Sequence, residues 1–410
     1  MTATAPAEPA VALPAARADR GRLVGLDGIR GLAALFVVLH HCYLLAFPGY
    51  PRSTGPGWLG WLLYGHLAVV VFITLSGFSL AVSPARNEWR LGGRTRFAHR
   101  RAWRILPPYW AALAFSLLIA WTVTPQPDTA VPTAKSVAIY GLLLQDIVGA
   151  PSPNGAFWSI AIEAQLYLVF PLMLLLLRRV NALVLMVAVT VPVLAIGTLA
   201  PGVPAVHLFL RLTPQFAVLF ALGLVAAGII PAADRIRRLP WQWFAGLAAV
   251  PAVALIAVQG PMWTVTHYFW VDLAVGPSVA LLLAAVATRR PLPLVRLLDT
   301  WPVRKLGTFS YSLYLVHAPI VVALNRKVVG PWLGTGLTAF WVMLALAVPT
   351  SIVFAWAFAS VFEIPFQRYR SWAPLRAAIR SRIRGRASAA SGGQAHELAT
   401  AVPERPPLAP

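Results

Sequence analysis

Residues 26–47 read LDGIRGLAALFVVLHHCYLLAF, an apolar run with an arginine near its start and two histidines near its end. A helix over this run is long enough to cross the ~30 Å hydrocarbon core of a bilayer, because each residue adds about 1.5 Å. Similar runs follow along the chain, at about 58–82, 105–123, 157–177, 182–199, 208–230, 241–258, 268–287, 306–324 and 333–361. The sequence therefore predicts an all-α, polytopic membrane protein with about ten transmembrane helices.

The amino-acid composition agrees with this fold class. Of the 410 residues, 59% are hydrophobic and 11% are charged, whereas a soluble globular protein has about a quarter charged residues. These proportions exclude an ordinary soluble enzyme, a coiled coil and a disordered protein. The single cysteine, Cys42, excludes a disulfide framework and a cysteine-based zinc site. We expect Cys42 to act as a small apolar residue, and we expect no metal site.

The charge is strongly basic, with 34 Lys and Arg against 13 Asp and Glu and a formal net charge of +21. In a soluble protein this excess would indicate nucleic-acid binding. Here the basic residues lie between the apolar runs. If the N-terminus is cytoplasmic, 29 of them fall in cytoplasmic segments and five outside, as the positive-inside rule requires. Both termini are predicted to be cytoplasmic, and no nucleic-acid partner is expected.

The chain divides into three parts. Residues 1–22 are rich in Ala and Pro and lack the apolar core of a signal peptide, so they are predicted to be a disordered cytoplasmic N-terminus. Residues 23–366 form the predicted transmembrane domain. Residues 367–410 are basic, then rich in Ala, Ser, Gly and Pro, and are predicted to be a cytoplasmic tail. The apolar segment 136–148 is too short to span and is predicted to be interfacial or re-entrant.

The first apolar run aligns Arg30 with His41. Eleven residues at 100° each end 20° beyond three full turns, so both side chains lie on one helix face, about 16 Å apart along the axis. A charge inside a membrane is costly and often marks a functional site. A structural interpretation stays open, in which the histidine bonds a neighbouring helix and the arginine extends to the interface.

Two further segments place polar groups in the membrane. Glu163 lies one turn past Ser159 and about 7–8 Å in from Trp158, where it can serve as an acid, a base or an orienting partner, or as half of a structural ion pair. Tyr314 and His317 share a face with Ser310 at i, i+4 and i+7. They can contact a substrate or form interhelical hydrogen bonds.

Arg101 and Arg104 lie at i and i+3 where the basic segment 86–104 enters the third run. We interpret this segment as a loop that leads into the helix. Two guanidinium groups on one helix face suit bidentate binding of phosphate. Topology and contact with lipid headgroups are the alternative explanation.

Together these segments resemble the acyltransferase family 3 of integral-membrane O-acyltransferases, which includes polysaccharide O-acetylases and macrolide acyltransferases. The matching stretches are LDGIRG (26–31) through His41, FITLSGF (72–78), RRAWRILP (100–107), WSIAIE (158–163) with Tyr167 and Pro171, SYSLYLVH (310–317) and Glu363-Ile364-Pro365. They occur in the family's order over residues 23–366. Ala68, where a glycine is usual, and His40 and His66, at commonly apolar or small positions, depart from the pattern and leave the acceptor preference open.

The resemblance implies roles for particular residues. The family's Arg-x10-His signature maps onto Arg30 and His41, and its Arg-x-x-Arg signature maps onto Arg101 and Arg104. The family moves an acyl group, usually acetyl, from cytoplasmic acyl-CoA to a hydroxyl. Acyl-CoA is then a donor substrate, and no permanently bound cofactor is expected. No hydrolase-like domain follows the last run, so we expect the stand-alone form.

On this basis we expect the CoA phosphates to bind Arg101 and Arg104, with Arg30 near the mouth of the site. His41 would act as general base or carry the acyl group transiently. Glu163 would be a second catalytic group that orients or charge-balances His41. His317 and Tyr314 would contact the acceptor, and Ser76 would add a hydroxyl in the second run.

One alternative stays open for the acceptor and one for the class of protein. A hydroxyl of a cell-surface glycan or glycolipid is the expected acceptor, and a macrolide-like secondary metabolite is the alternative. A secondary transporter or flippase would also place ionisable residues in the membrane, but the sequence lacks the inverted repeat and the paired broken helices of that class.

The 31 Arg and 3 Lys residues suggest a GC-rich bacterial genome. The expected location is the bacterial cytoplasmic membrane, with the lipid bilayer as surroundings.

Overall fold

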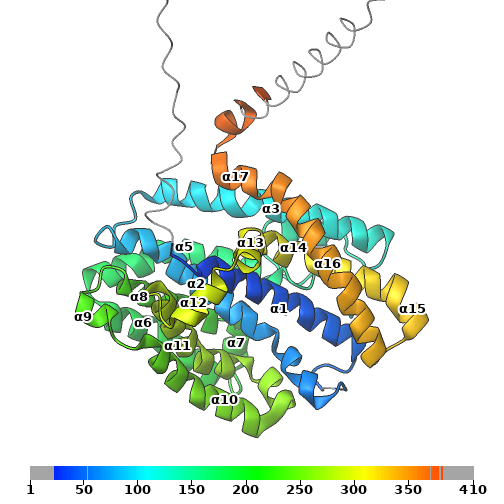
Figure 1. Ribbon diagram of the computed structural model, residues 1–410, viewed down its shortest axis with the longest axis horizontal. Helices are drawn as coiled ribbons and strands as arrows, with labels where there is room; N and C mark the ends of the chain where they lie inside the picture. Colours follow the sequence, from blue (N-terminus) through cyan, green and yellow to red (C-terminus); the bar gives the residue numbers. More distant parts are fainter. Residues whose placement is uncertain (1–22, 53, 370, 378–379, 382–410) are drawn as a thin grey trace, which may run out of the picture.

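The computed structural model describes residues 23–52, 54–369, 371–377 and 380–381, and Figure 1 shows the course of the chain. Within these residues every regular element is helical, and none is a β-strand. The predicted all-α class is therefore confirmed. The predicted N-terminal segment 1–22 and most of the predicted tail 367–410 lie outside the described residues.

Long helices form the body of the molecule. They are α1 (Leu26–Ala46), α2 (His66–Ala85), α3 (Arg94–Thr122), α5 (Trp158–Arg179), α6 (Ala182–Leu199), α8 (Gln215–Ala226), α10 (Trp241–Thr266), α11 (Tyr268–Ala287), α14 (Ser310–Leu324) and α16 (Leu337–Phe362). Short helices connect or extend them: α4 (Ala134–Gly141), α7 (Pro204–His207), α9 (Asp234–Arg237), α12 (Leu292–Leu298), α13 (Trp301–Thr308), α15 (Gly330–Leu333) and α17 (Ile364–Tyr369). Four further turns are helical but not α-helical: η1 (Gly57–Tyr64), η2 (Leu208–Leu212), η3 (Ala227–Ile229) and η4 (Asn325–Val329).

The number of membrane-crossing helices agrees with the prediction. Nine segments of the described chain are long and apolar enough to cross a membrane, and the bent pair Pro204–Leu212 and Gln215–Ile229 makes a tenth if it is one span. The pair bends by 47°. Thr213 at the bend has a left-handed backbone conformation with φ of 44°, and Pro214 has no N–H with which to continue the helix.

The interpretation of residues 86–104 as a loop is wrong for their second half. Helix α3 begins at Arg94, so Arg101 and Arg104 lie well inside a helix rather than at its start. Arginine is among the better helix formers, and the proline pair that follows, Pro107 and Pro108, is accommodated inside α3. In the short apolar segment 136–148 only residues 136–141 are helical, as the end of the eight-residue helix α4, which is too short to cross a bilayer.

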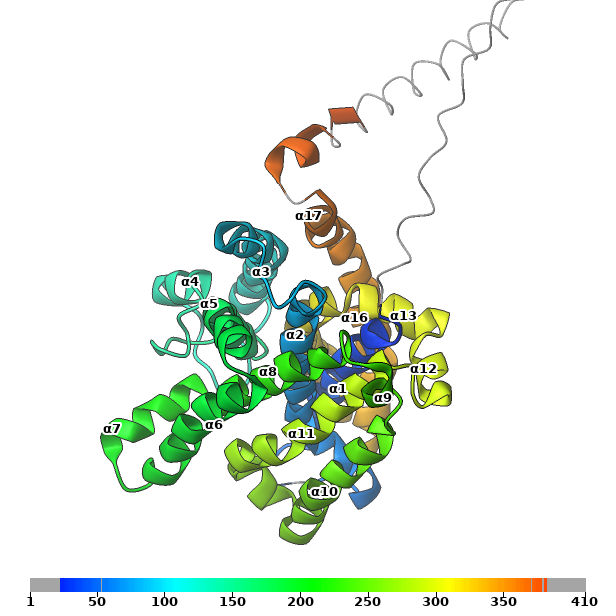
Figure 2. The same cartoon turned by 90° about the vertical axis from the view of Figure 1, so that its left-hand side faces the viewer.

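Helix α1 occupies the middle of the bundle. In both views it lies between α3 on one side and α10 on the other (Figures 1 and 2). It contacts α2, α13, α14 and α16. Arg30 and His41 therefore lie within the bundle, where side chains of several helices can reach them.

Helices α2 and α8 approach each other closely through two glycines. A Cβ atom added to Gly223 would lie 1.9 Å from the backbone oxygen of Thr74, and one added to Gly77 would lie 2.1 Å from that of Phe220. Small residues permit such backbone approach between membrane helices. This packing fixes α2, which carries Ser76 and Ser79 of the site described below.

We predict that Gly223→Ala destabilises the protein by roughly 1–3 kcal/mol, because the added methyl group forces the two backbones apart. Cys42 is the only cysteine of the chain and is buried, so a thiol-reactive dye that labels it on unfolding reports the melting temperature in detergent. Gly246→Ala is the matched control, since nothing lies within 4 Å of its added Cβ. Equal melting temperatures for the two variants would contradict the prediction.

Candidate functional site

A cavity of about 350 Å³ opens within the bundle between α1, α2, α3, α5, α13, α14 and the junction of α16 with α17. Six of the eight residues to which the sequence analysis gave a role line it. They are Arg30, Ser76, Arg101, Arg104, Glu163 and Tyr314. The other two, His41 and His317, do not line it. The cavity therefore collects the predicted donor-binding residues, and the histidines lie beyond its wall.

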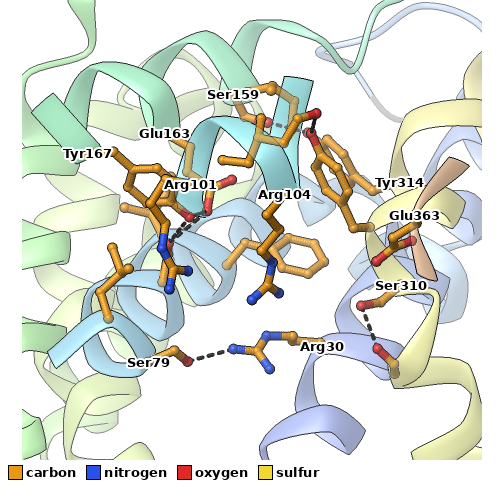
Figure 3. Close-up of a pocket in the computed structure, with 18 of the residues that line it drawn as sticks. Arg30, Ser79, Arg101, Arg104, Ser159, Glu163, Tyr167, Ser310, Tyr314 and Glu363 are labelled. Atoms are coloured by element: carbon orange, nitrogen blue, oxygen red, sulfur yellow. Dashed lines mark hydrogen bonds between the residues drawn. The ribbon is translucent and has the colours of Figure 1, made fainter. Parts of the chain in front are cut away.

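Three guanidinium groups face the same space (Figure 3). Arg30 is held in place, since its Nη1 lies 3.1 Å from Asp27 Oδ1 and its Nη2 donates to Ser79 Oγ at 2.6 Å. Asp27 lies one turn before Arg30 on α1, whereas Ser79 comes from α2. Arg30 is thus held by side chains of both α1 and α2 before any ligand binds.

Arg101 and Arg104 have free hydrogen-bonding capacity. Arg101 Nε is buried and has no hydrogen-bond partner among the described residues. Its guanidinium carbon lies 5.9 Å from the ring centre of Phe97, which in turn stacks on Phe170 of α5. Neither arginine forms an ion pair with a carboxylate of the described chain. Two cationic groups at the cavity are therefore available to an anionic ligand.

Glu163 is part of a network with Ser76 and Tyr167. Ser76 Oγ donates to Glu163 Oε1 at 2.7 Å and lies 2.9 Å from the Tyr167 hydroxyl, which also donates to Glu163 Oε1. Glu163 was expected to orient His41, but its hydrogen bonds within the described chain lead to α2 and to its own helix. It lies close enough to Arg30 and Arg101 to interact with their charges.

Glu363 closes the cavity from the C-terminal side. Its Oε2 accepts hydrogen bonds from Ser312 N at 3.1 Å and Ser312 Oγ at 2.5 Å, and its Oε1 accepts from Gln367 Nε2 at 2.8 Å. The carboxylate is thus satisfied by α14 and α17. From the sequence, Glu363-Ile364-Pro365 is only a feature of the family resemblance, and no role is predicted for this residue.

The hydrogen bonds around His317 fix its protonation. Its Nδ1 lies 2.8 Å from the carbonyl oxygen of Tyr314 and 3.2 Å from that of Leu313. Carbonyl oxygens only accept, so Nδ1 carries the proton and Nε2 carries a lone pair. That Nε2 lies 3.3 Å from Nδ1 of His41.

His41 is oriented by the same network. Its Nδ1 lies 2.8 Å from the carbonyl oxygen of Val37, so it is a donor both to Val37 and to His317 Nε2. The remaining nitrogen, Nε2, is then unprotonated. It has no hydrogen-bond partner in the described part of the chain. His317 thereby holds His41 in the tautomer with an unprotonated Nε2, which a general base or nucleophile requires.

A second buried polar cluster lies at the other end of α2 from Ser79. His66 Nε2 is 3.0 Å from both oxygens of Asp272, and Gln215 Nε2 donates to Asp272 Oδ2 at 3.2 Å. Asp272 is fully buried. The cluster joins α2, α8 and α11, and it explains how a carboxylate is accommodated inside α11. Within the described residues, no group of three or more His, Cys, Asp or Glu could hold a metal ion.

Some residues of the site could have been found from the sequence and some could not. Asp27 and Tyr167 lie one helical turn from Arg30 and Glu163, so i, i+3 and i, i+4 spacing pairs them. Ser79 reaches Arg30 from 49 residues away, and no local pattern indicates such a contact.

Comparison with known proteins identifies the family of this chain. The model of acyltransferase family 3, described as an acyltransferase domain, matches residues 23–360. "Acyltransferase MdmB" of Streptomyces mycarofaciens is 29% identical over 338 residues, which are 76% of this chain and 82% of that relative. "Putative peptidoglycan O-acetyltransferase YrhL" of Bacillus subtilis is 26% identical over 80% of this chain and 52% of its own. "O-acetyltransferase OatA" of Staphylococcus aureus is 23% identical over 74% of this chain and 51% of its own.

The matched part of the chain spans about half the length of YrhL and of OatA and most of the length of MdmB. No solved structure matches the chain significantly. The family match covers all the helices that contribute to the cavity except the short α17, together with the histidine pair. This protein, with its many apolar helices, is therefore a multi-pass membrane member of acyltransferase family 3.

Proposed function

We propose that this acyltransferase takes an acyl group, usually acetyl, from acyl-CoA bound at the arginine cavity and transfers it to a hydroxyl group with the help of His41. The observation that carries the proposal is that Arg101 and Arg104, neither of which forms a close ion pair within the described chain, line a cavity whose Tyr314 wall adjoins His317, the neighbour of His41. Acyl-CoA acts as a substrate and is not a resident cofactor.

The arginine side suits the phosphate groups of CoA. Arg101 and Arg104 lie one turn apart on α3, so their planar guanidinium groups can bind phosphate oxygens in pairs. Arg30 is already bound by Asp27 and Ser79, and it adds a fixed positive charge to the same space. The cavity has the size of a small-molecule site, and it suits the pantetheine arm with its acyl group, while the nucleotide lies at the mouth.

His41 supplies the chemistry. As a general base, its Nε2 takes the proton of the acceptor hydroxyl while the hydroxyl oxygen bonds to the thioester carbonyl carbon. The carbon–sulfur bond breaks, and the proton passes to the CoA thiolate. As a nucleophile, the same Nε2 bonds to the acyl carbon while the carbon–sulfur bond breaks and CoA thiolate leaves. The acceptor hydroxyl oxygen then bonds to the acyl carbon, the carbon–nitrogen bond breaks, and the hydroxyl proton passes to the CoA thiolate. Both routes need the lone pair that the contacts with Val37 and His317 leave on Nε2.

Three predicted roles change under this proposal. Glu163, bonded to Ser76 and Tyr167, offsets the positive charge of Arg30 and Arg101 and does not orient His41. His317 acts as a positioning residue, since it contacts His41 directly and does not line the cavity. Tyr314, expected to contact the acceptor, contacts the donor instead, since it lines the arginine cavity.

The proposed acceptor is a hydroxyl of a cell-surface glycan or glycolipid. Two of the relatives are named as O-acetyltransferases, and one of these names specifies peptidoglycan. The proposed location is the bacterial cytoplasmic membrane with both termini in the cytoplasm, because 29 of the 34 basic residues then face inward. The arginine cavity then draws its donor from the cytoplasm.

We predict that His41→Ala lowers acyl transfer at least about 100-fold, the lower range for loss of a general base. Membranes with wild-type or variant protein receive radiolabelled acetyl-CoA, and label is followed into lipid, polysaccharide and small-molecule fractions. The labelled fraction identifies the acceptor class. His207→Ala, an exposed histidine outside the site, is the control. Transfer that persists in His41→Ala at equal protein abundance would contradict the proposal.

We predict that Arg101→Ala and Arg104→Ala each raise the KM for acetyl-CoA about tenfold or more, because each removes charge-assisted hydrogen bonds to phosphate. Arg100→Ala is the matched control, since Arg100 is exposed and does not line the cavity. S-acetyl-N-acetylcysteamine, a thioester without phosphates, serves as a second donor. An equal loss with both donors would show that the arginines do not bind phosphate.

The proposed topology is tested with introduced cysteines. The only native cysteine, Cys42, is buried, so the background of labelling is low. A membrane-impermeant maleimide applied to intact cells is expected to label Ala130→Cys, in the loop after α3, and not Arg235→Cys, in α9. Both positions are exposed. The reverse pattern would place the arginine cavity on the outer side.

A further inference from the structure

Tyr314 of α14 lies between the cavity and the histidine pair and is held by Phe72 of α2 and Ser159 of α5. We call these three side chains the partition. All three line the cavity. Tyr314 also has its ring centre 5.9 Å from that of His317, which lies 4.9 Å from that of His41. Tyr314 thus touches the cavity on one side and the histidine pair on the other.

The partition is held closed by specific contacts. The hydroxyl groups of Tyr314 and Ser159 are 2.7 Å apart and bond α14 to α5, as Figure 3 shows. The rings of Phe72 and Tyr314 meet edge to face with their centres 5.5 Å apart. Ser159 and Tyr314 each keep only 5% of their surface exposed. The partition is therefore a packed wall of three helices.

This wall conflicts with the reaction unless it moves. Acyl transfer through His41 requires the thioester carbonyl to reach Nε2 of His41 or an acceptor hydroxyl bound to that Nε2, and the donor enters from the arginine end of the cavity. Because His41 does not line the cavity, the Tyr314 side chain has to leave its place, and the Tyr314–Ser159 hydrogen bond has to break. Until then the acyl group lies against the partition.

We propose that the partition is the acyl-binding end of the donor site, that it selects short acyl groups such as acetyl, and that its Tyr314–Ser159 bond keeps the bound thioester apart from the far side of the bundle. This inference rests on the proposed function. A longer chain meets the Tyr314 and Phe72 rings, and in an apolar pocket one methylene group changes selectivity about 10-fold or more. A broken bond admits water, whose oxygen attacks the thioester carbonyl. The products are then free carboxylic acid and CoA thiol, and no acceptor is acylated.

The test compares variants that open the partition in different ways. Purified full-length protein in nanodiscs receives acetyl-, butyryl- or hexanoyl-CoA, and CoA thiol release without acceptor is measured beside transfer to native membrane acceptors. Tyr314→Ala removes the ring, and we expect the butyryl-to-acetyl ratio of kcat/KM to rise at least tenfold. Tyr314→Phe and Ser159→Ala keep the ring and lose the bond, so we expect faster hydrolysis with the wild-type chain-length preference.

Controls separate this inference from the proposed function. Ser351→Ala removes a buried serine hydroxyl of α16 that does not line the cavity, and we expect it to match wild type. If Tyr314→Ala does not fold, as judged by labelling of Cys42, Phe72→Leu opens the wall from α2 and should relax chain-length selection in the same direction. Unchanged chain-length and hydrolysis profiles in folded variants, beside His41-dependent transfer by wild type, would overturn the partition alone. Absence of His41-dependent transfer from any CoA thioester would overturn both.

Discussion

The arginine cluster within an apolar bundle constrains the rest of this structure. A cationic side chain inside a bilayer costs several kcal/mol unless it is paired or reaches water. Arg30 is paired with Asp27 and held by Ser79, whereas Arg101 and Arg104 face the cavity and form no close ion pair within the described chain. The surrounding helices must therefore leave space at this point, and that space can receive an anionic ligand. The close approach of α2 and α8 at Gly77 and Gly223 secures the helix that provides Ser79 and one wall of this space.

A second, separate arrangement serves the histidines. His317 is fixed by backbone carbonyls of its own helix and in turn fixes His41. This chain of hydrogen bonds resembles the carboxylate–histidine arrangements of other acyltransfer sites in its logic, since each group sets the tautomer of the next. The arginine end and the histidine end adjoin at Tyr314, which lines the cavity and contacts His317. Under the proposed function, the donor binds at the arginine end, and its acyl group is transferred to the acceptor at the histidine end, deeper in the bundle. This arrangement suits a reaction that moves the acyl group part of the way across the membrane.

The sequence predicted the fold class because apolar runs of membrane-spanning length are a strong and local signal. It also indicated six of the residues that line the cavity, because charged and polar groups stand out inside such runs. It did not predict that residues 94–104 are helical, since charge patterns alone do not separate a basic loop from a basic helix. Nor did it predict the partners. Helical periodicity aligned Arg30 with His41, but the side chains that divide them come from α2, α5 and α14, and only the packing of distant segments brings these together.

The central claim is that CoA binds at the arginine cavity with its acyl end toward Tyr314. A cryo-EM structure of the protein in nanodiscs with a non-hydrolysable acetyl-CoA analogue tests this most directly. The account predicts phosphate oxygens within hydrogen-bond distance of the Arg101 and Arg104 guanidinium groups, with the acetyl group against Phe72, Ser159 and Tyr314. Density for the nucleotide at the opposite face of the bundle, near the His66–Asp272 pair, would contradict it.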